Sequence, residues 1–303
     1  TATGMAAISA VLLHLLGGGG HLVASADLYG VTAELLRHDL PRLGATVDLV
    51  DTTDPSAVEA AIKPETRAIF TESFSNPLLR VADLPALGEI AHRRGVELVV
   101  DNTFLSPAIL RPLEHGASIV VHSATKYLSG HGNVLGGVVC GQRQAIGEIA
   151  GLLSRLGGVM SPFSAWLLLA GVKTLPLRVA RHCANASALA ALLAAHPAVE
   201  TVHYPGLPSH PQRDLAQRLV GDRFGGMLAF ALHGGEASAG RLLNQLDLAT
   251  IAVSLGDPAT LAWPIAGSGL IRLSVGLEDW ADLEADFFAA LAACGTSRAD
   301  TAG

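Results

Sequence analysis

The chain has 303 residues, of which 50% are hydrophobic and 16% are charged, and its formal net charge is −7. This length predicts about two domains that bury a large core. The negative charge argues against a nucleic-acid partner, because nucleic acids bind to basic protein surfaces.

The sequence also argues against a membrane location and a metal site. No apolar run approaches the roughly 20 residues that a membrane span needs, and the N-terminal segment TATGMAAISA lacks the basic region of a signal peptide. The three cysteines, Cys140, Cys183 and Cys294, are odd in number and do not have metal-ligand spacing. Together these features predict a soluble, cytoplasmic protein.

Short runs of β-branched residues alternate with helical segments over residues 1–140. The predicted strands are His21–Ala26, Thr46–Val50, Ala68–Thr71, Val96–Val100 and Ser118–Val121. The predicted helices are Pro55–Ile62, capped by Asp54, and Leu84–Arg94, which lies between a cap at Asp83 and a stop at Gly95. This alternation predicts an α/β domain built around a mostly parallel sheet.

The pattern changes near residue 175, where a long Ala/Leu-rich helix over Val179–Ala195 begins the C-terminal part. After a proline-rich turn, the predicted elements are a strand at Met227–Leu232, a helix at Ala237–Leu246, a strand at Leu270–Val275 and a helix at Asp279–Ala293. The sequence therefore predicts a large domain over residues 1–175 and a smaller α+β domain over residues 176–303.

Polar residues stand at the ends of several predicted strands. Glu72, Asp101 and Ser123 each follow an apolar run, and Lys126 comes three residues after Ser123. In open parallel sheets, ligands bind outside the carboxyl ends of the strands. An aspartate and a lysine at two such ends therefore indicate a catalytic site rather than ordinary loop starts.

The segments SNPLL, VVDNTF, RPLEHGA, VVHSATKYLSGHG, RHCANA, YPGL and RLSVGLED follow one another in this order. With this set, the chain resembles the family of Cys/Met-metabolism enzymes that use pyridoxal 5′-phosphate (PLP). The resemblance covers nearly the whole chain. It implies fold type I of the PLP-dependent transferases, with a PLP-binding large domain and a small C-terminal domain.

Lys126 and Asp101 have the chemistry that PLP requires. The cofactor needs an amine that holds its aldehyde as a Schiff base and can later act as a base, and Lys126 is the candidate. A carboxylate against the pyridine nitrogen keeps that nitrogen protonated, and Asp101 is the candidate. For the phosphate, the candidate donors are the hydroxyl groups of Ser123 and Thr125 and the backbone N–H groups of Gly4 and Met5, at the start of a predicted helix.

The resemblance implies roles for the remaining candidates. Tyr29 would stack on the cofactor ring and act in proton transfer at the leaving group, while Asn76 and Thr103 would contact the cofactor near its 3′ oxygen. Arg272 stands alone inside an apolar strand and would bind the substrate carboxylate, assisted by Ser254.

Two departures from the family pattern are apparent. Members usually carry several dozen more residues before TATGMAA, including a Tyr-x-Arg motif that reaches the phosphate of a neighbouring subunit. The loop between SLGD and the Arg272 strand is short, and Trp263 stands where histidine is usual. We expect that segments outside this sequence complete the phosphate site.

The resemblance implies a carbon–sulfur lyase that releases an α-keto acid, ammonia and a thiol from methionine or a related sulfur amino acid. Cystathionine γ-lyase, cystathionine γ-synthase and, less favoured, an O-acylhomoserine sulfhydrylase remain alternatives. The reason is Val31, because methionine γ-lyases typically have cysteine at this position and cystathionine enzymes usually have glycine. A PLP-binding relative without turnover is the non-enzymatic alternative. The expected assembly is a homotetramer built from two dimers.

Overall fold

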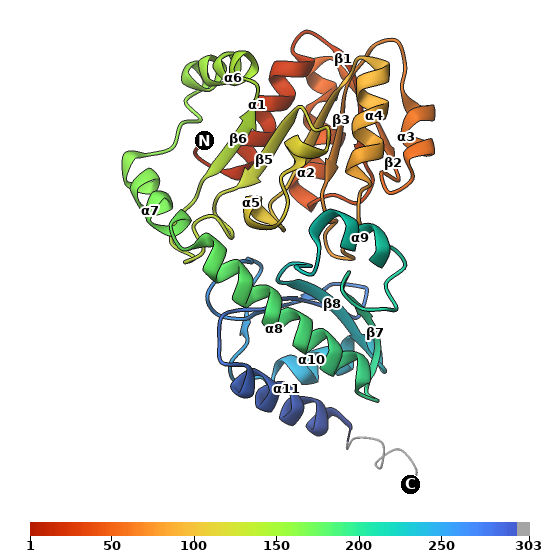
Figure 1. The fold of residues 1–303 in the computed structure, drawn as a ribbon, viewed down its shortest axis with the longest axis vertical. Helices are drawn as coiled ribbons and strands as arrows, with labels where there is room; N and C mark the ends of the chain where they lie inside the picture. The colour runs from red at the N-terminus through yellow and green to blue at the C-terminus, as the bar shows by residue number, and fades with distance from the viewer. Residues whose placement is uncertain (296–303) are drawn as a thin grey trace. The chain divides into compact units, whose positions relative to one another are not determined.

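The structure is a computed structural model that describes residues 1–295. The chain forms two compact units, which are coloured along the chain in Figure 1. The first unit contains Thr1–Asn76, Arg80–Ser129 and Asn133–Lys173. The second contains Pro77–Leu79, Gly130–Gly132 and the chain from Thr174 onward.

The first unit is built on a six-stranded sheet with the order β2-β1-β3-β4-β5-β6. Its strands are β1 (Gly20–Ser25), β2 (Ala45–Val50), β3 (Thr66–Glu72), β4 (Glu97–Asp101), β5 (Ile119–Ser123) and β6 (Gly137–Gly141). The first five strands are parallel, and β6 pairs antiparallel with β5. β4 and β5 carry continuous buried apolar runs at residues 98–100 and 119–121, as expected for strands that are covered on both faces.

The first unit also contains helices and short helical turns. They are α1 (Gly4–Leu16), α2 (Gly30–Glu34), α3 (Pro55–Ala61), α4 (Leu84–Arg94), α5 (Ser106–Ile109), α6 (Arg143–Leu156) and α7 (Pro162–Val172), with short turns η1 (Leu35–Asp39), η2 (Pro41–Leu43) and η3 (Pro112–His115). Leu12 of α1, Leu36 of η1 and Ile149 of α6 join one hydrophobic core with the strands. α3 and α4 pack against each other and against β2 and β4.

The second unit has a five-stranded sheet with the order β7-β8-β11-β10-β9. Its strands are β7 (Val199–His203), β8 (Met227–Leu232), β9 (Thr250–Ile251), β10 (Leu261–Ile265) and β11 (Leu270–Ser274), and its helices are α8 (Leu175–Ala195), α9 (Arg213–Val220), α10 (Gly235–Leu243) and α11 (Trp280–Gly295). All pairs are antiparallel except β10 with β9. α8 packs on β7 and β8, and α11 packs on α8 and α10.

Local signals set the helix ends that the sequence predicts. The Asp83 carboxylate accepts a hydrogen bond of 3.2 Å from the backbone N–H of Ala86, and α4 stops at Gly95 with φ at 66°. Asp54 caps α3 in the same way, through the backbone N–H of Ser56 at 2.9 Å. A left-handed residue at the end of a helix favours glycine, because other side chains are strained there.

The expected α/β class is confirmed by the mostly parallel sheet and the second, mostly antiparallel sheet. Within residues 1–295, no single helix combines the length and hydropathy of a membrane span. α7 and α8, which are interrupted at residues 173 and 174, reach those values only when taken together.

Candidate active site

Three neighbouring strands of the first unit end in polar residues along one edge of the sheet, the edge formed by the carboxyl ends of the strands. β3 ends at Glu72, β4 at Asp101 and β5 at Ser123. Glu72 pairs in register with Asp101, so their side chains leave the sheet at the same level. Because the strands are parallel, the sheet brings together residues that lie 51 positions apart between Glu72 and Ser123. Lys126 follows in the turn after β5, where its backbone N–H donates to the Ser123 carbonyl at 3.2 Å.

Asp101 is held in one orientation by Thr103. The backbone N–H and the hydroxyl of Thr103 both donate to Oδ1 of Asp101, at 2.9 and 2.6 Å. Burial raises the pKa of Asp101 to about 6, and the two hydrogen bonds from Thr103 act against that rise. Asp101 is therefore mainly ionised at neutral pH. Both hydrogen bonds from Thr103 go to Oδ1 and none goes to Oδ2.

The Thr103 hydroxyl also links two strand ends. Its oxygen accepts a hydrogen bond of 2.8 Å from the backbone N–H of Ser123, while its proton is donated to Asp101. The sequence predicts that Thr103 contacts the cofactor. The structure shows that its hydroxyl connects Asp101 to Ser123, so direct contact with the cofactor stays a prediction.

The N-terminus of α1 reaches the Ser123 side chain. A Cβ atom added to Gly4 would lie 2.8 Å from the Ser123 Cβ and 2.9 Å from its Oγ, so only glycine permits this approach. The Thr3 hydroxyl caps the helix by accepting from the backbone N–H of Ala6 at 2.9 Å. The first N–H groups of a helix have no acceptor within the helix, so those of Gly4 and Met5 suit an anion beside Ser123.

The turn that carries Lys126 is tied to the start of β6. The Thr125 hydroxyl accepts from the backbone N–H of Gly136 at 3.1 Å, and the Thr125 backbone N–H donates to the Gly136 carbonyl at 3.3 Å. The Ser129 hydroxyl donates to the Thr125 carbonyl at 3.1 Å. Lys126 is half-buried within this hydrogen-bonded turn. The fold thus holds the lysine backbone firmly next to Ser123.

Two further candidates lie in loops at the same edge. Tyr29 precedes α2, with 48% of its surface exposed, and its backbone N–H donates to Oε1 of Glu72 at 2.7 Å. The backbone N–H of Asn76 also donates to the Glu72 carboxylate. The first unit therefore brings together Tyr29, Asn76, Asp101, Ser123 and the segment 125–126.

Arg272 and Ser254 lie in the second unit. Arg272 is buried in β11, and its guanidinium donates to the carbonyl oxygen of Val253 at 2.5 Å and to that of Ser254 at 3.4 Å. Trp263 pairs with Arg272 from the adjacent strand β10. The predicted pair is thus in contact, and the group of Ser254 that meets Arg272 is its backbone carbonyl.

A polar stripe on α8 fixes the loop that follows β11. The His182 Nδ1 lies 2.6 Å from the Val275 carbonyl, which can only accept, so this nitrogen carries the proton. Asn185 donates to the Gly276 carbonyl at 3.1 Å. Burial lowers the pKa of His182 to about 4, which keeps the ring neutral. These contacts hold the end of the Arg272 strand in place.

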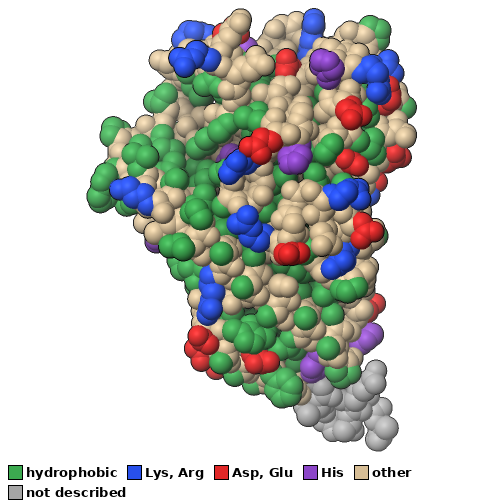
Figure 2. Space-filling view, viewed as in Figure 1, with side chains coloured by type: hydrophobic (Ala, Val, Ile, Leu, Met, Phe, Trp, Pro, Cys, Tyr) green, Lys and Arg blue, Asp and Glu red, His purple; other side chains and the backbone are tan. Residues whose placement is uncertain are grey.

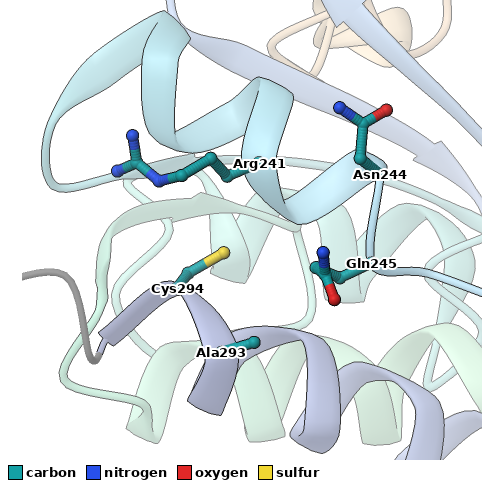
Figure 3. Close-up of a pocket in the computed structure, with 5 residues that line it drawn as sticks. All are labelled: Arg241, Asn244, Gln245, Ala293 and Cys294. Atoms are coloured by element: carbon teal, nitrogen blue, oxygen red, sulfur yellow. The ribbon is translucent and has the colours of Figure 1, made fainter.

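One surface pocket of about 220 Å³ lies in the second unit, between α10 and α11, and none of the candidate residues lines it. Figure 3 shows its lining, which consists of Arg241, Asn244, Gln245, Ala293 and Cys294. Within residues 1–295, no group of histidine, cysteine and acidic side chains could hold a metal ion.

The residues at the sheet edge of the first unit fit the cofactor that the sequence implies. Lys126 offers an amine in a fixed turn, and Asp101 offers an ionised carboxylate for a protonated ring nitrogen. Ser123 and the N-terminus of α1 converge closely enough to exclude a Cβ atom at Gly4, which makes a cradle for a phosphate. Each part of PLP therefore has a matching group in the first unit.

Comparisons with known proteins show the family to which the chain belongs. The L-methionine γ-lyase of Porphyromonas gingivalis is 45% identical over 94% of this chain and 76% of its own length. The O-succinylhomoserine sulfhydrylase of Pseudomonas aeruginosa is 43% identical over 97% of this chain and 77% of its own, and the cystathionine γ-lyase of Bacillus subtilis is 43% identical over 95% and 80%. The model of the family described as Cys/Met metabolism PLP-dependent enzyme matches residues 1–292, which confirms the expected resemblance, fold type and cofactor. The chain belongs to this family of PLP-dependent enzymes.

Proposed function

We propose that the protein is a carbon–sulfur lyase that carries out γ-elimination on L-methionine or a related sulfur amino acid. With water, the reaction yields an α-keto acid, ammonia and a thiol. The observation that carries this proposal is the convergence of Asp101, Ser123 and the Lys126 turn at one sheet edge. Relatives named L-methionine γ-lyase, at 45% identity over most of the chain, favour methionine as the substrate.

Two residues would carry the chemistry of the large unit. Lys126 would hold the cofactor aldehyde on its ε-amino group and later move a proton as a base. Asp101 would hold the proton on the pyridine nitrogen, because its carboxylate is ionised at neutral pH. When bound, PLP supplies an electron sink for the substrate carbon from which Lys126 removes the proton.

The cofactor phosphate would be bound by Ser123, Thr125 and the backbone N–H groups of Gly4 and Met5. The close approach of Gly4 to Ser123 supports this assignment. The Thr125 hydroxyl accepts from the backbone N–H of Gly136 at 3.1 Å and donates to its carbonyl at 3.3 Å, so its proton would turn from this carbonyl to the phosphate when the cofactor binds. A helix N-terminus beside two hydroxyl groups is favourable for an anion.

The loops at the same edge would orient the ring and the leaving group. Tyr29 would stack on the cofactor ring and exchange a proton with the departing sulfur, and its half-exposed side chain is accessible for both. Asn76 would donate to the 3′ oxygen of the ring. Thr103 would act at the cofactor through Asp101, whose Oδ1 it holds.

We assign substrate recognition to the second unit. Arg272 would bind the substrate carboxylate through two parallel hydrogen bonds, and Ser254 would shape the loop that receives it. The contacts of Arg272 with the carbonyls of Val253 and Ser254 orient its guanidinium. In this assignment residues 1–175 form the PLP-binding domain and residues 176–303 form the small domain.

A second candidate reaction is the γ-elimination on cystathionine that a cystathionine γ-lyase carries out. The γ-synthase and sulfhydrylase reactions are less favoured candidates. Relatives with cystathionine γ-lyase and sulfhydrylase names at 43% identity support these candidates. Trp263, which pairs with Arg272, is the residue in the second unit that would contact the substrate side chain and so help to select the substrate.

We also propose that the protein works as a homo-oligomer, namely a tetramer made of two dimers, in the cytoplasm. α7 exposes Phe163, Trp166 and Leu169 by 68%, 64% and 66%, and the spacing of three residues puts them on one helix face. Figure 2 shows hydrophobic side chains gathered in this region. Large exposed apolar patches mark protein interfaces. The three cysteines are free, which suits a reducing compartment.

One panel of assays tests the proposed reaction. Purified protein is incubated with L-methionine, L-homocysteine, L-cystathionine and L-cysteine, and α-keto acid and thiol are both measured. The proposal predicts the highest kcat/KM with L-methionine and no activity in Lys126→Ala. Preference for cystathionine would replace the proposed substrate. A lack of turnover with all four would refute the lyase reaction and would leave the γ-synthase reaction, the sulfhydrylase reaction and a binding function.

A further inference from the structure

Glu72 is a buried carboxyl group at the candidate site to which the proposed reaction gives no role. It is the last residue of β3, and only 9% of it is exposed. Its register partner on β4 is Asp101. A buried acid beside the cofactor carboxylate is costly to ionise, so the hydrogen bonds that it makes indicate its role at the site.

The Glu72 carboxyl joins two loops that carry candidate cofactor contacts. Its Oε1 accepts from the backbone N–H of Tyr29 at 2.7 Å, and the carboxyl also accepts from the backbone N–H of Asn76. Tyr29 lies in the loop after β1, and Asn76 lies in the loop after β3. One side chain therefore sets the backbone positions of the residue proposed to stack on the ring and the residue proposed to donate to it.

The charges around Glu72 decide its ionisation state. Burial is the largest influence, and the negative charges of Asp101 and Asp27 act in the same direction, so the pKa of Glu72 lies well above its usual range. Asp27 is itself paired with Arg80 at 2.8 Å. Each of these two adjacent carboxyl groups disfavours a charge on the other, so Glu72 takes up a proton more readily than an ordinary glutamate does.

We propose that Glu72 is a positioning residue of the cofactor site, which holds Tyr29 and Asn76 as a neutral acid and leaves the negative charge to Asp101. This inference rests on the proposed function, because the cofactor roles of Tyr29 and Asn76 belong to it. A neutral acceptor suits the task, since two backbone N–H groups need an oxygen but no full charge.

The test compares Glu72→Ala with Glu72→Gln. Glutamine keeps a carbonyl oxygen for the two N–H groups and is neutral, whereas alanine leaves both N–H groups without this acceptor. Glu97 is the matched control, because it is an exposed glutamate at the opposite end of the neighbouring strand β4. Glu97→Ala and Glu97→Gln should behave like wild type.

Two readouts are needed, one of which does not involve the cofactor. In the apoprotein, hydrogen exchange should become faster in Glu72→Ala for the peptides that contain Tyr29 and Asn76. The dissociation constant for PLP, measured by titrating the apoprotein, should rise by about 10- to 30-fold in Glu72→Ala, because the loops must be ordered upon binding. Glu72→Gln should restore slow exchange and wild-type affinity.

The outcomes separate this inference from the proposed function. Wild-type exchange and affinity in Glu72→Ala would overturn the inference. A Glu72→Gln variant as defective as Glu72→Ala would also overturn it, because the charge would then be required; this arm still decides if the alanine variant does not fold. Failure of the wild-type protein to bind PLP would refute the proposed function, while the exchange measurement would still test whether Glu72 bridges the two loops.

Discussion

Replacement of Asp101 by asparagine should change how the stability of the apoprotein depends on pH. The folded protein raises the pKa of Asp101 from 3.8 to about 6 by burial. The folded state therefore binds this proton more tightly than the unfolded chain does. The resulting stabilisation is fully present below about pH 4 and is lost as the pH rises through about 6.

The size of the effect follows from the difference between the two pKa values. A shift of one pH unit corresponds to about 1.4 kcal/mol, so the rise of Asp101 from 3.8 to about 6 corresponds to about 3 kcal/mol. The wild-type apoprotein should lose about that much unfolding free energy through Asp101 between pH 4 and pH 7.5. Asp101→Asn cannot ionise and should lack this loss.

Urea unfolding of both apoproteins across this pH range measures the difference. Glu72 is present in both proteins, but the charge of Asp101 raises the pKa of Glu72, so the difference between the two profiles reports on Asp101 and Glu72 together. Asp39→Asn is the control for the loss of one charge, because Asp39 is exposed in the same unit. Parallel profiles for wild type and Asp101→Asn would refute the argument. The same variant should lose turnover by orders of magnitude, since an amide cannot hold the ring nitrogen protonated.

Three further predictions concern Arg272, Thr103 and Trp166. Arg272→Lys keeps the charge but loses the planar fork, so KM should rise strongly while the dissociation constant for PLP stays unchanged; unfolding or PLP loss with an unchanged KM would make Arg272 structural. Thr103→Val removes a hydrogen bond to the ionised Asp101, so NMR titration of the apoprotein should show the pKa of Asp101 raised by about one unit. Thr103→Ser keeps this hydrogen bond and should leave the pKa of Asp101 unchanged. Trp166→Glu should shift sedimentation towards smaller species if the exposed face of α7 is an interface, and an unchanged assembly would exclude that face.

Much of the fold could be predicted from the sequence because its signals are local. α4 lies at the predicted positions Leu84–Arg94, since Asp83 and Gly95 act within one turn of its ends. β6 was not predicted, because Gly137–Gly141 is short and its place at the sheet edge depends on antiparallel pairing with β5. α7 was also not predicted, since its exposed apolar face lacks the amphipathic pattern of a surface helix.

The candidate site was predictable as a set of residue types but not as a network of contacts. Strand ends and the HSATKY segment indicate Asp101 and Lys126 without any coordinates. The sequence cannot show that Thr103 donates to Asp101 while accepting from Ser123, because this requires the register of β4 and β5. It marks Glu72 only as a polar strand end, since its partner Tyr29 lies 43 positions away in the loop after β1.

The central claim is that Lys126 carries the cofactor, and the chain allows a direct test of it. The sequence contains three lysines, Lys63, Lys126 and Lys173. Borohydride reduction of the protein loaded with PLP, followed by peptide mapping with mass spectrometry, identifies the lysine that is linked to the cofactor. The label should lie on the peptide that contains Lys126. Labelling of Lys63 or Lys173, with Lys126 unmodified, would contradict the account.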